Sequence, residues 1–308
     1  MMETEDRLNL LKLALLSACA DPVNGASAQS QLRRVAEILS EVAGENLAVT
    51  LREILLGRLA LAHVAARLQR PELKLLAYEV AVCICNADSA HSDPEHAFLE
   101  HLRVALALDV RTARSFEREA DAVIGVPLQP DPSRVPPASA HPVDAATLAR
   151  IVDDYAVLTG ALAARAEPLA LLAAIPLQMK MIYRIGKAFG HEPDRGRIKA
   201  LMSTVGVEPV SQYVEACGKM ILGGALDRPR TRTEPSIEAS EACFAKTYAL
   251  GHVATRVHGD GVTDMQLLHE SYADAYAEGC EGFAMRTDDV LARARQTEIN
   301  DLLSLVKQ

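Results

Sequence analysis

The sequence has 308 residues, of which 49% are hydrophobic, and its net charge at pH 7 is −9. A chain of this length can form two or three domains of ordinary size. The acidic charge argues against general binding to a nucleic-acid backbone, which requires a basic surface to displace counterions, and it favours a soluble cytoplasmic protein.

Alanine and leucine dominate the composition, aromatic residues make up 4% of the chain, and tryptophan is absent. Alanine and leucine lose little side-chain freedom in a helix, and the alternating β-branched and aromatic patterns typical of strands are rare here. We therefore predict an all-α fold.

The first part of the chain is predicted to form six helices. They cover residues 4–19, 27–43, 46–69, 71–86, 93–107 and 110–124. Pro71 opens the fourth helix, where its missing N–H does no harm, and Ser92 followed by Glu95 fits a capping box at the start of the fifth.

Residues 125–143 contain six of the fifteen prolines. Such a segment cannot sustain a helix and behaves as a semi-rigid, extended spacer. The sequence therefore predicts two helical-bundle domains, 1–124 and 144–308, joined by a proline-rich linker.

Seven helices are predicted after this linker. They cover residues 144–166, 168–190, 194–205, 208–225, 236–257, 263–284 and 287–306. The most apolar stretch, 168–177, is shorter than the roughly 18 residues that suggest a membrane span, and the acidic N-terminus is unlike a signal peptide. We expect no transmembrane span.

Two segments of the first domain resemble each other. Residues 13–39 and 78–106 each contain an apolar helix that ends in Ala-Asp (at Asp21 and Asp88), a polar loop and a second amphipathic helix. This internal repeat predicts a pseudo-twofold arrangement of two helix–loop–helix units.

The second copy also resembles the helical domain of the tellurite-resistance protein TerB. The family pattern is a helix, Ala-Asp-Gly, a polar turn and a glutamate that opens the next helix; Asp88 and Glu95 occupy the acidic positions, whereas Ser89 replaces the glycine and the loop is longer. The resemblance covers about residues 5–122. It implies an interaction module of the stress-response type.

The second domain resembles a helical domain of unknown function that is attached to, or encoded beside, bacterial small GTPases. The segments 175–194 and 246–263 carry this resemblance. The pairs Gly186-Lys187 and Gly218-Lys219 lack the other residues of a phosphate-binding loop, so any GTPase would be a separate chain.

Acidic residues and histidines gather between residues 88 and 101. They are Asp88, His91, Asp93, Glu95, His96, Glu100 and His101. Imidazole with carboxylate suits zinc, iron or manganese, and His96 and Glu100 share one helical face. The alternative, which we favour, is a capped helix start, because acidic residues stabilise a helix N-terminus.

A basic stripe is predicted on one helix of the second domain. Lys180, Arg184, Lys187 and His191 recur at helical spacing, opposite apolar residues such as Met181. This stripe is a candidate for contact with an anionic lipid surface or an acidic partner, and an ordinary solvated helix face is the alternative.

The remaining signals are structural. The six cysteines are scattered in apolar helices and are predicted to be buried, reduced thiols. The small residues of 218–226 and 249–256 predict close helix packing.

No nucleophile elbow or activated-cysteine motif is present, so we predict no catalytic residues and no enzymatic activity.

Together these patterns predict a non-enzymatic, cytoplasmic, TerB-like interaction module that needs no cofactor. Its expected partners are proteins, including a separate GTPase or a membrane-associated complex, with peripheral contact at the inner membrane face. The alternative is a metal-binding or metal-dependent protein that holds a divalent metal at residues 88–101.

Overall fold

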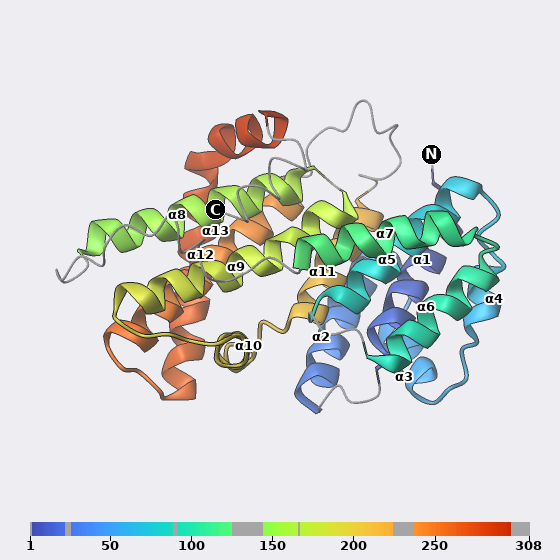
Figure 1. Ribbon diagram of the computed structural model, residues 1–308, viewed down its shortest axis with the longest axis horizontal. Helices are drawn as coiled ribbons and strands as arrows, with labels where there is room; N and C mark the ends of the chain where they lie inside the picture. Colours follow the sequence, from blue (N-terminus) through green and yellow to red (C-terminus); the bar gives the residue numbers. More distant parts are fainter. Residues whose placement is uncertain are drawn as a thin grey trace. The chain divides into compact units, whose positions relative to one another are not determined.

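The computed structural model describes residues 2–21, 26–88, 92–124, 144–165, 167–223 and 237–296. Within these ranges the chain forms thirteen helices and no strand, which confirms the predicted all-α fold (Figure 1). The proline-rich linker, 125–143, lies outside the described residues and stays a prediction.

The helices follow the predicted order closely. They are α1 (Thr4–Ala18), α2 (Ala26–Ala43), α3 (Leu47–Leu55), α4 (Leu61–Ala65), α5 (Pro71–Asn86), α6 (Asp93–Ala105), α7 (Val110–Ile124), α8 (Ala145–Ala164), α9 (Pro168–Ala188), α10 (Arg195–Thr204), α11 (Pro209–Leu222), α12 (Ile237–Gly259) and α13 (Met265–Gln296).

Two predicted helix boundaries are wrong. The segment 46–69 was expected as one helix but forms α3 and α4, because Gly57 takes a φ of +66° and ends α3. The predicted break near residue 285 does not occur, since α13 runs on without interruption. Ala275, Phe283 and Val290 are buried at helical spacing along α13, so one continuous face packs into the core.

The chain divides into two compact units. Unit 1 comprises Met1–Gly125, Ala166–Leu172 and Glu208–Glu234; unit 2 comprises Val126–Arg165, Ala173–Val207 and Pro235–Gln308.

Helix α11, predicted in the second domain, instead belongs to unit 1, where it packs against α1, α2 and α5. The absence of a side chain at Gly218 permits this packing, because a Cβ atom there would lie 2.5 Å from Leu39 Cδ1 of α2. Tyr213 of the same helix is buried and donates a hydrogen bond to the carbonyl of Pro168 (2.9 Å).

Unit 1 is organised around α1, which packs against α3, α4, α5 and α11. Leu10, Leu11 and Leu15 of α1 are each 1% exposed, so almost the whole helix faces protein. The first helices of the two repeat copies, α1 and α5, pack against each other. This contact is what a paired arrangement of the copies requires.

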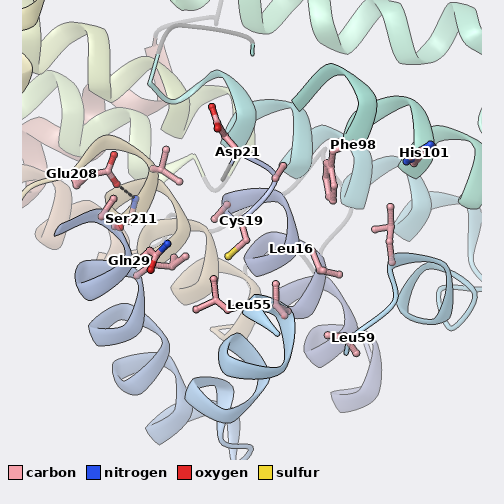
Figure 2. Close-up of a pocket in the computed structure, with 17 residues that line it drawn as sticks. Leu16, Cys19, Asp21, Gln29, Leu55, Leu59, Phe98, His101, Glu208 and Ser211 are labelled. Carbon is pink, nitrogen blue, oxygen red and sulfur yellow. Dashed lines mark hydrogen bonds between the residues drawn. The ribbon is translucent and has the colours of Figure 1, made fainter. Parts of the chain in front are cut away.

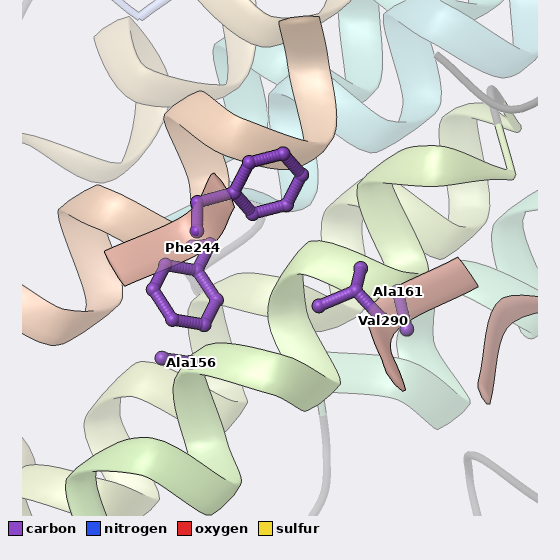
Figure 3. Close-up of a cluster of buried hydrophobic side chains, with 5 residues drawn as sticks. Ala156, Ala161, Phe244 and Val290 are labelled. Atoms are coloured by element: carbon purple, nitrogen blue, oxygen red, sulfur yellow. The ribbon is translucent and has the colours of Figure 1, made fainter. Parts of the chain in front are cut away.

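Unit 2 is organised around α12, which packs against α8 and α13. Its core contains Ala156, Ala161, Phe244, Phe283 and Val290 (Figure 3). Phe244 and Phe283 meet edge to face, with ring centroids 5.7 Å apart, a favourable arrangement of aromatic quadrupoles.

Glycines allow the helices of unit 2 to approach closely. A Cβ atom at Gly251 of α12 would lie 2.6 Å from Val152 Cγ2 of α8, and one at Gly279 of α13 would lie 2.9 Å from Ala245 Cα of α12. The close packing predicted for the small residues of 249–256 is therefore confirmed.

In the described part of the chain, α9 is the one helix that is long and apolar enough, by length and composition alone, to cross a membrane. Its most apolar window is 89% buried inside the fold. Core helices of soluble proteins share these properties, so α9 is weak evidence for a span.

Candidate functional site

Unit 1 contains a pocket of about 500 Å³ (Figure 2). It lies between the end of α1, the start of α2, the α3–α4 region, α6 and the start of α11. Much of its wall is apolar and includes Leu16, Leu32, Leu55 and Phe98. Pockets of this size with a few polar groups in apolar walls are the usual places where proteins bind ligands.

Polar side chains come to the pocket from distant parts of the chain. Asp21 follows α1, Gln29 lies on α2, His101 lies on α6, and Glu208 precedes α11. Figure 2 shows Glu208 and Ser211 on one side of the pocket and Phe98 with His101 on the other. The site therefore combines apolar walls with two carboxylates and an imidazole.

Local capping interactions hold Glu208 in place. Its carboxylate accepts a hydrogen bond from the backbone N–H of Ser211 (2.8 Å), so Glu208 caps α11. Its own N–H donates to Gln31 Oε1 of α2 (3.1 Å). The first bond is local to the start of α11, and the second connects this start to α2 at the edge of the pocket.

Cys19, at the end of α1, also lines the pocket. Burial raises the pKa of its thiol to about 11, so the thiol is protonated near neutral pH and is a poor nucleophile. Cys83, Cys85, Cys217 and Cys243 are buried, as predicted, and burial raises the pKa of Cys217 to about 12; Cys19 and Cys280 are only partly buried, so the prediction is wrong for these two.

The predicted capping box at α6 is confirmed. The backbone N–H of Ser92 donates to Glu95 Oε2 (2.9 Å), and the N–H of Glu95 donates to Ser92 Oγ (3.4 Å). Burial is the main cause of a raised pKa at Glu95, and the negative charges of Asp88 and Asp21 raise it further, while hydrogen bonds from Ser92 lower it. Carboxylates of both repeat copies therefore lie within electrostatic reach of each other.

The other predicted metal ligands do not come together, and each has its own local environment. Asp93 is exposed in the first turn of α6, and Glu100 forms a bidentate ion pair with Arg103 at 2.6 and 2.8 Å. His91 lies outside the described residues. Within the described ranges, no group of three or more His, Cys, Asp or Glu side chains is placed to hold a metal ion.

His96 and Glu100 do share one face of α6, as predicted, and both line a second pocket of about 440 Å³ between α6 and α7. Arg103, Arg114 and Glu117 contribute further charges to this pocket. Tyr78 donates a hydrogen bond to Glu117 Oε1 (2.7 Å), which connects α5 to α7.

The capping box gives a pH prediction. A carboxyl whose pKa is raised on folding destabilises the folded state when ionised, and this penalty disappears as the pH falls toward its ordinary pKa of 4.5. Glu95→Gln retains a capping oxygen without the charge. We expect urea unfolding at pH 7 to show Glu95→Gln at least as stable as the wild type, with any advantage shrinking as the pH approaches 4.5. A less stable variant at pH 7 would contradict this account.

The basic stripe is only partly at the surface. Lys180 is 4% exposed, so its predicted place on an exposed cationic face is wrong. The reason is that this part of α9 is buried on all sides, and helical spacing alone does not show which face meets solvent. Burial, followed by the nearby charge of Arg184, lowers the pKa of Lys180.

The other three residues of the stripe are exposed, and each contacts a side chain of the same unit. Arg184 lies over the ring of Tyr155, 5.8 Å from its centroid, and Lys187 forms an ion pair with Glu192. The imidazole of His191 meets that of His258. Their role in binding an anionic surface stays a prediction.

Asp21 and His101 were identified from the sequence, but the pocket that they line was not predicted. Asp21 was found through the repeat, and His101 through the histidine cluster. Gln29 and Glu208 were missed because the pocket forms only when α2 and α11 pack together, across a large separation in sequence. The available signal was Glu208-Pro209, an acidic residue before a helix-opening proline.

No protein family, curated protein or solved structure matches this chain.

Proposed function

We propose that this protein is a non-enzymatic, cytoplasmic interaction module of the TerB-like stress-response type, and that unit 1 binds a protein partner. The observation that carries the proposal is the pocket of about 500 Å³ with apolar walls and acidic residues at its edge. The resemblances found in the sequence suggest a separate GTPase or a membrane-associated complex as the partner.

The apolar part of the pocket favours an apolar side chain of the partner. Leu55 is 45% exposed, and Leu16 and Phe98 line the same pocket, so apolar surface gathers at this one place. Covering such surface contributes about 25 cal/mol for each Å² removed from water. One or two inserted side chains would supply the central contact of an interface.

The charges of the pocket favour a basic partner segment. Asp21 and Glu208 line the pocket, and the whole chain carries a net charge of −9. Complementary charge speeds association and disfavours acidic competitors. We therefore propose a segment in which a large apolar residue is flanked by lysine or arginine.

Short synthetic peptides test this proposal by fluorescence anisotropy. One peptide has phenylalanine flanked by lysines; in two others glutamates replace the lysines or serine replaces the phenylalanine. Only the first should bind. Ala28→Phe, which fills the pocket from α2, and Asp21→Lys should each weaken binding by about tenfold or more, equivalent to about 1.4 kcal/mol.

Glu37→Lys is the matched control, because Glu37 is exposed on α2, does not line the pocket and undergoes the same type of charge reversal as Asp21. It should leave affinity nearly unchanged. An equal loss of affinity in Glu37→Lys and Asp21→Lys would show that peptide binding depends only on the net charge of the protein. Binding that survives Ala28→Phe would exclude the pocket.

Divalent-metal binding near residues 88–101 is the second candidate. The observation that favours it is that the negative charges of Asp88 and Asp21 reach Glu95 and add to the rise in its pKa, although burial is the larger cause and no three of the described side chains are placed to hold a metal ion. At one hundred times its dissociation constant, a metal would stabilise the fold by about 2.7 kcal/mol. A rise in melting temperature with Zn²⁺ or Mn²⁺ that is lost in Asp88→Asn and His96→Ala would support it, and no rise would exclude it.

A further inference from the structure

Two histidines of unit 2 meet where α9 and α12 end. His191 follows α9, and His258 lies in the last turn of α12, so the two residues are far apart in sequence. Their Nδ1 atoms are 3.2 Å apart, and their ring centroids are 5.3 Å apart. His191 is exposed and His258 is partly buried, so the pair is open to solvent.

The backbone around this pair is closely packed. The N–H of His191 donates to the carbonyl of Gly186 (2.8 Å), and Gly190 between them takes a φ of +79°, which turns the chain back toward α9. A Cβ atom at Gly186 would lie 2.8 Å from Pro193 Cγ and 3.4 Å from His258 Cε1. The loop after α9 therefore fits against the end of α12 with no room for a larger residue.

A second close approach connects the same two helix ends. A Cβ atom at Gly259 would lie 2.7 Å from Cζ of Phe189. Phe189 precedes His191 by two residues, and Gly259 directly follows His258. Both imidazoles thus project from backbone segments whose separation is set by packing, which is the preorganisation that a ligand site needs.

We propose that His191 and His258 form a two-imidazole binding site for a transition-metal ion such as Zn²⁺, Ni²⁺ or Cu²⁺. Imidazole nitrogens bind Zn²⁺ at about 2.0–2.1 Å, and at a tetrahedral angle two such nitrogens lie about 3.3–3.4 Å apart. The two Nδ1 atoms are already near that separation. When the metal binds, the proton between the two Nδ1 atoms moves to Nε2 of the imidazole that carried it, so both Nδ1 lone pairs are available to the ion and both rings stay neutral.

The site is distinct from ordinary structural metal centres. Two protein ligands leave the remaining coordination positions to water or to a ligand from another molecule. Imidazole ligands suit zinc, copper and nickel, whereas Mg²⁺ and Ca²⁺ prefer oxygen. Binding should therefore be selective for the first group and readily reversible.

Isothermal titration of the full chain with Zn²⁺ and Cu²⁺ tests the proposal, and electron paramagnetic resonance of the Cu²⁺ complex reports nitrogen ligation. We expect a site with nitrogen ligands that His191→Gln and His258→Gln each weaken by about tenfold or more, and no comparable binding of Mg²⁺. Because His191 is exposed, His191→Gln should fold even if His258→Gln does not.

His269→Gln and His96→Gln are the controls, because both residues are exposed and lie on other helices. They should leave the site intact, and His96→Gln also separates this site from residues 88–101. Metal binding that is unchanged in His191→Gln, or absent from the wild type at millimolar metal, would contradict the proposal. The two histidines would then form a hydrogen bond only.

Discussion

Gly279→Ala is expected to destabilise the protein by about 1–3 kcal/mol, the usual cost of inserting a methyl group into a well-packed interior. The new Cβ would lie 2.9 Å from Ala245 Cα and 3.3 Å from the Ala245 carbonyl oxygen. Both are backbone atoms of α12, so no side chain can rotate to make room. Relief requires α13 to move away from α12, which would loosen the core around Phe244 and Phe283.

Gly282→Ala is the matched control on the same helix. A Cβ atom at Gly282 has no neighbour within 4 Å in the described structure, and alanine is favoured over glycine in a helix interior by about 0.5–1 kcal/mol. This variant should therefore raise the urea midpoint while Gly279→Ala lowers it. Shifts of the same sign in both variants would show that the close approach of α12 and α13 is not a constraint.

Helix positions followed from the sequence because their signals are local. The capping box of Ser92 and Glu95 and the proline at position 71 act within one turn, and both are found where they were predicted. The break predicted near residue 285 also depended on a local signal, but the structure does not contain it. Thr287 and the following aspartates can start a helix, but the Thr287 hydroxyl donates to the Phe283 carbonyl within α13 (2.8 Å).

Packing partners could not be predicted in the same way. Nothing local in α11 shows that Gly218 faces Leu39, about 180 residues earlier in the chain, so chain order placed α11 in the wrong unit. The same limit applies to Lys180, whose spacing matched a surface stripe although its side chain is buried. The pocket of unit 1 depends on the packing of α11 against α2, which the sequence did not predict. Of its charged side chains, the sequence analysis therefore identified Asp21 and His101 but not Glu208.

The core of unit 2 contains a polar connection that the sequence did not reveal. Thr247 of α12 donates to the carbonyl of Cys243 (2.8 Å), and its Oγ1 also lies 2.8 Å from Thr159 Oγ1 of α8 and 3.0 Å from Gln178 Nε2 of α9. If Thr159 and Gln178 both donate, the Thr247 hydroxyl uses its proton and both lone pairs. All three side chains are 0% exposed, so no water can replace these bonds.

Thr247→Val is therefore expected to destabilise the protein by about 1–3 kcal/mol, because the buried amide of Gln178 loses this acceptor, whereas the Thr159 hydroxyl can still donate to the carbonyl of Ala156 (3.2 Å). Valine preserves the shape of threonine, so the loss would report hydrogen bonding rather than a cavity.

Thr255→Val is the control on the same helix. Thr255 is partly buried, and its hydroxyl donates to the Gly251 carbonyl (3.0 Å), a backbone group already within the helix. Its replacement should cost about 1 kcal/mol or less. Thr159→Val combined with Thr247→Val should cost less than the sum of the single changes, since the two hydroxyls share one hydrogen bond that either single substitution already removes. Urea unfolding of the four variants measures this coupling. Strictly additive losses, or equal losses in Thr247→Val and Thr255→Val, would show that the three helices are held by apolar packing alone.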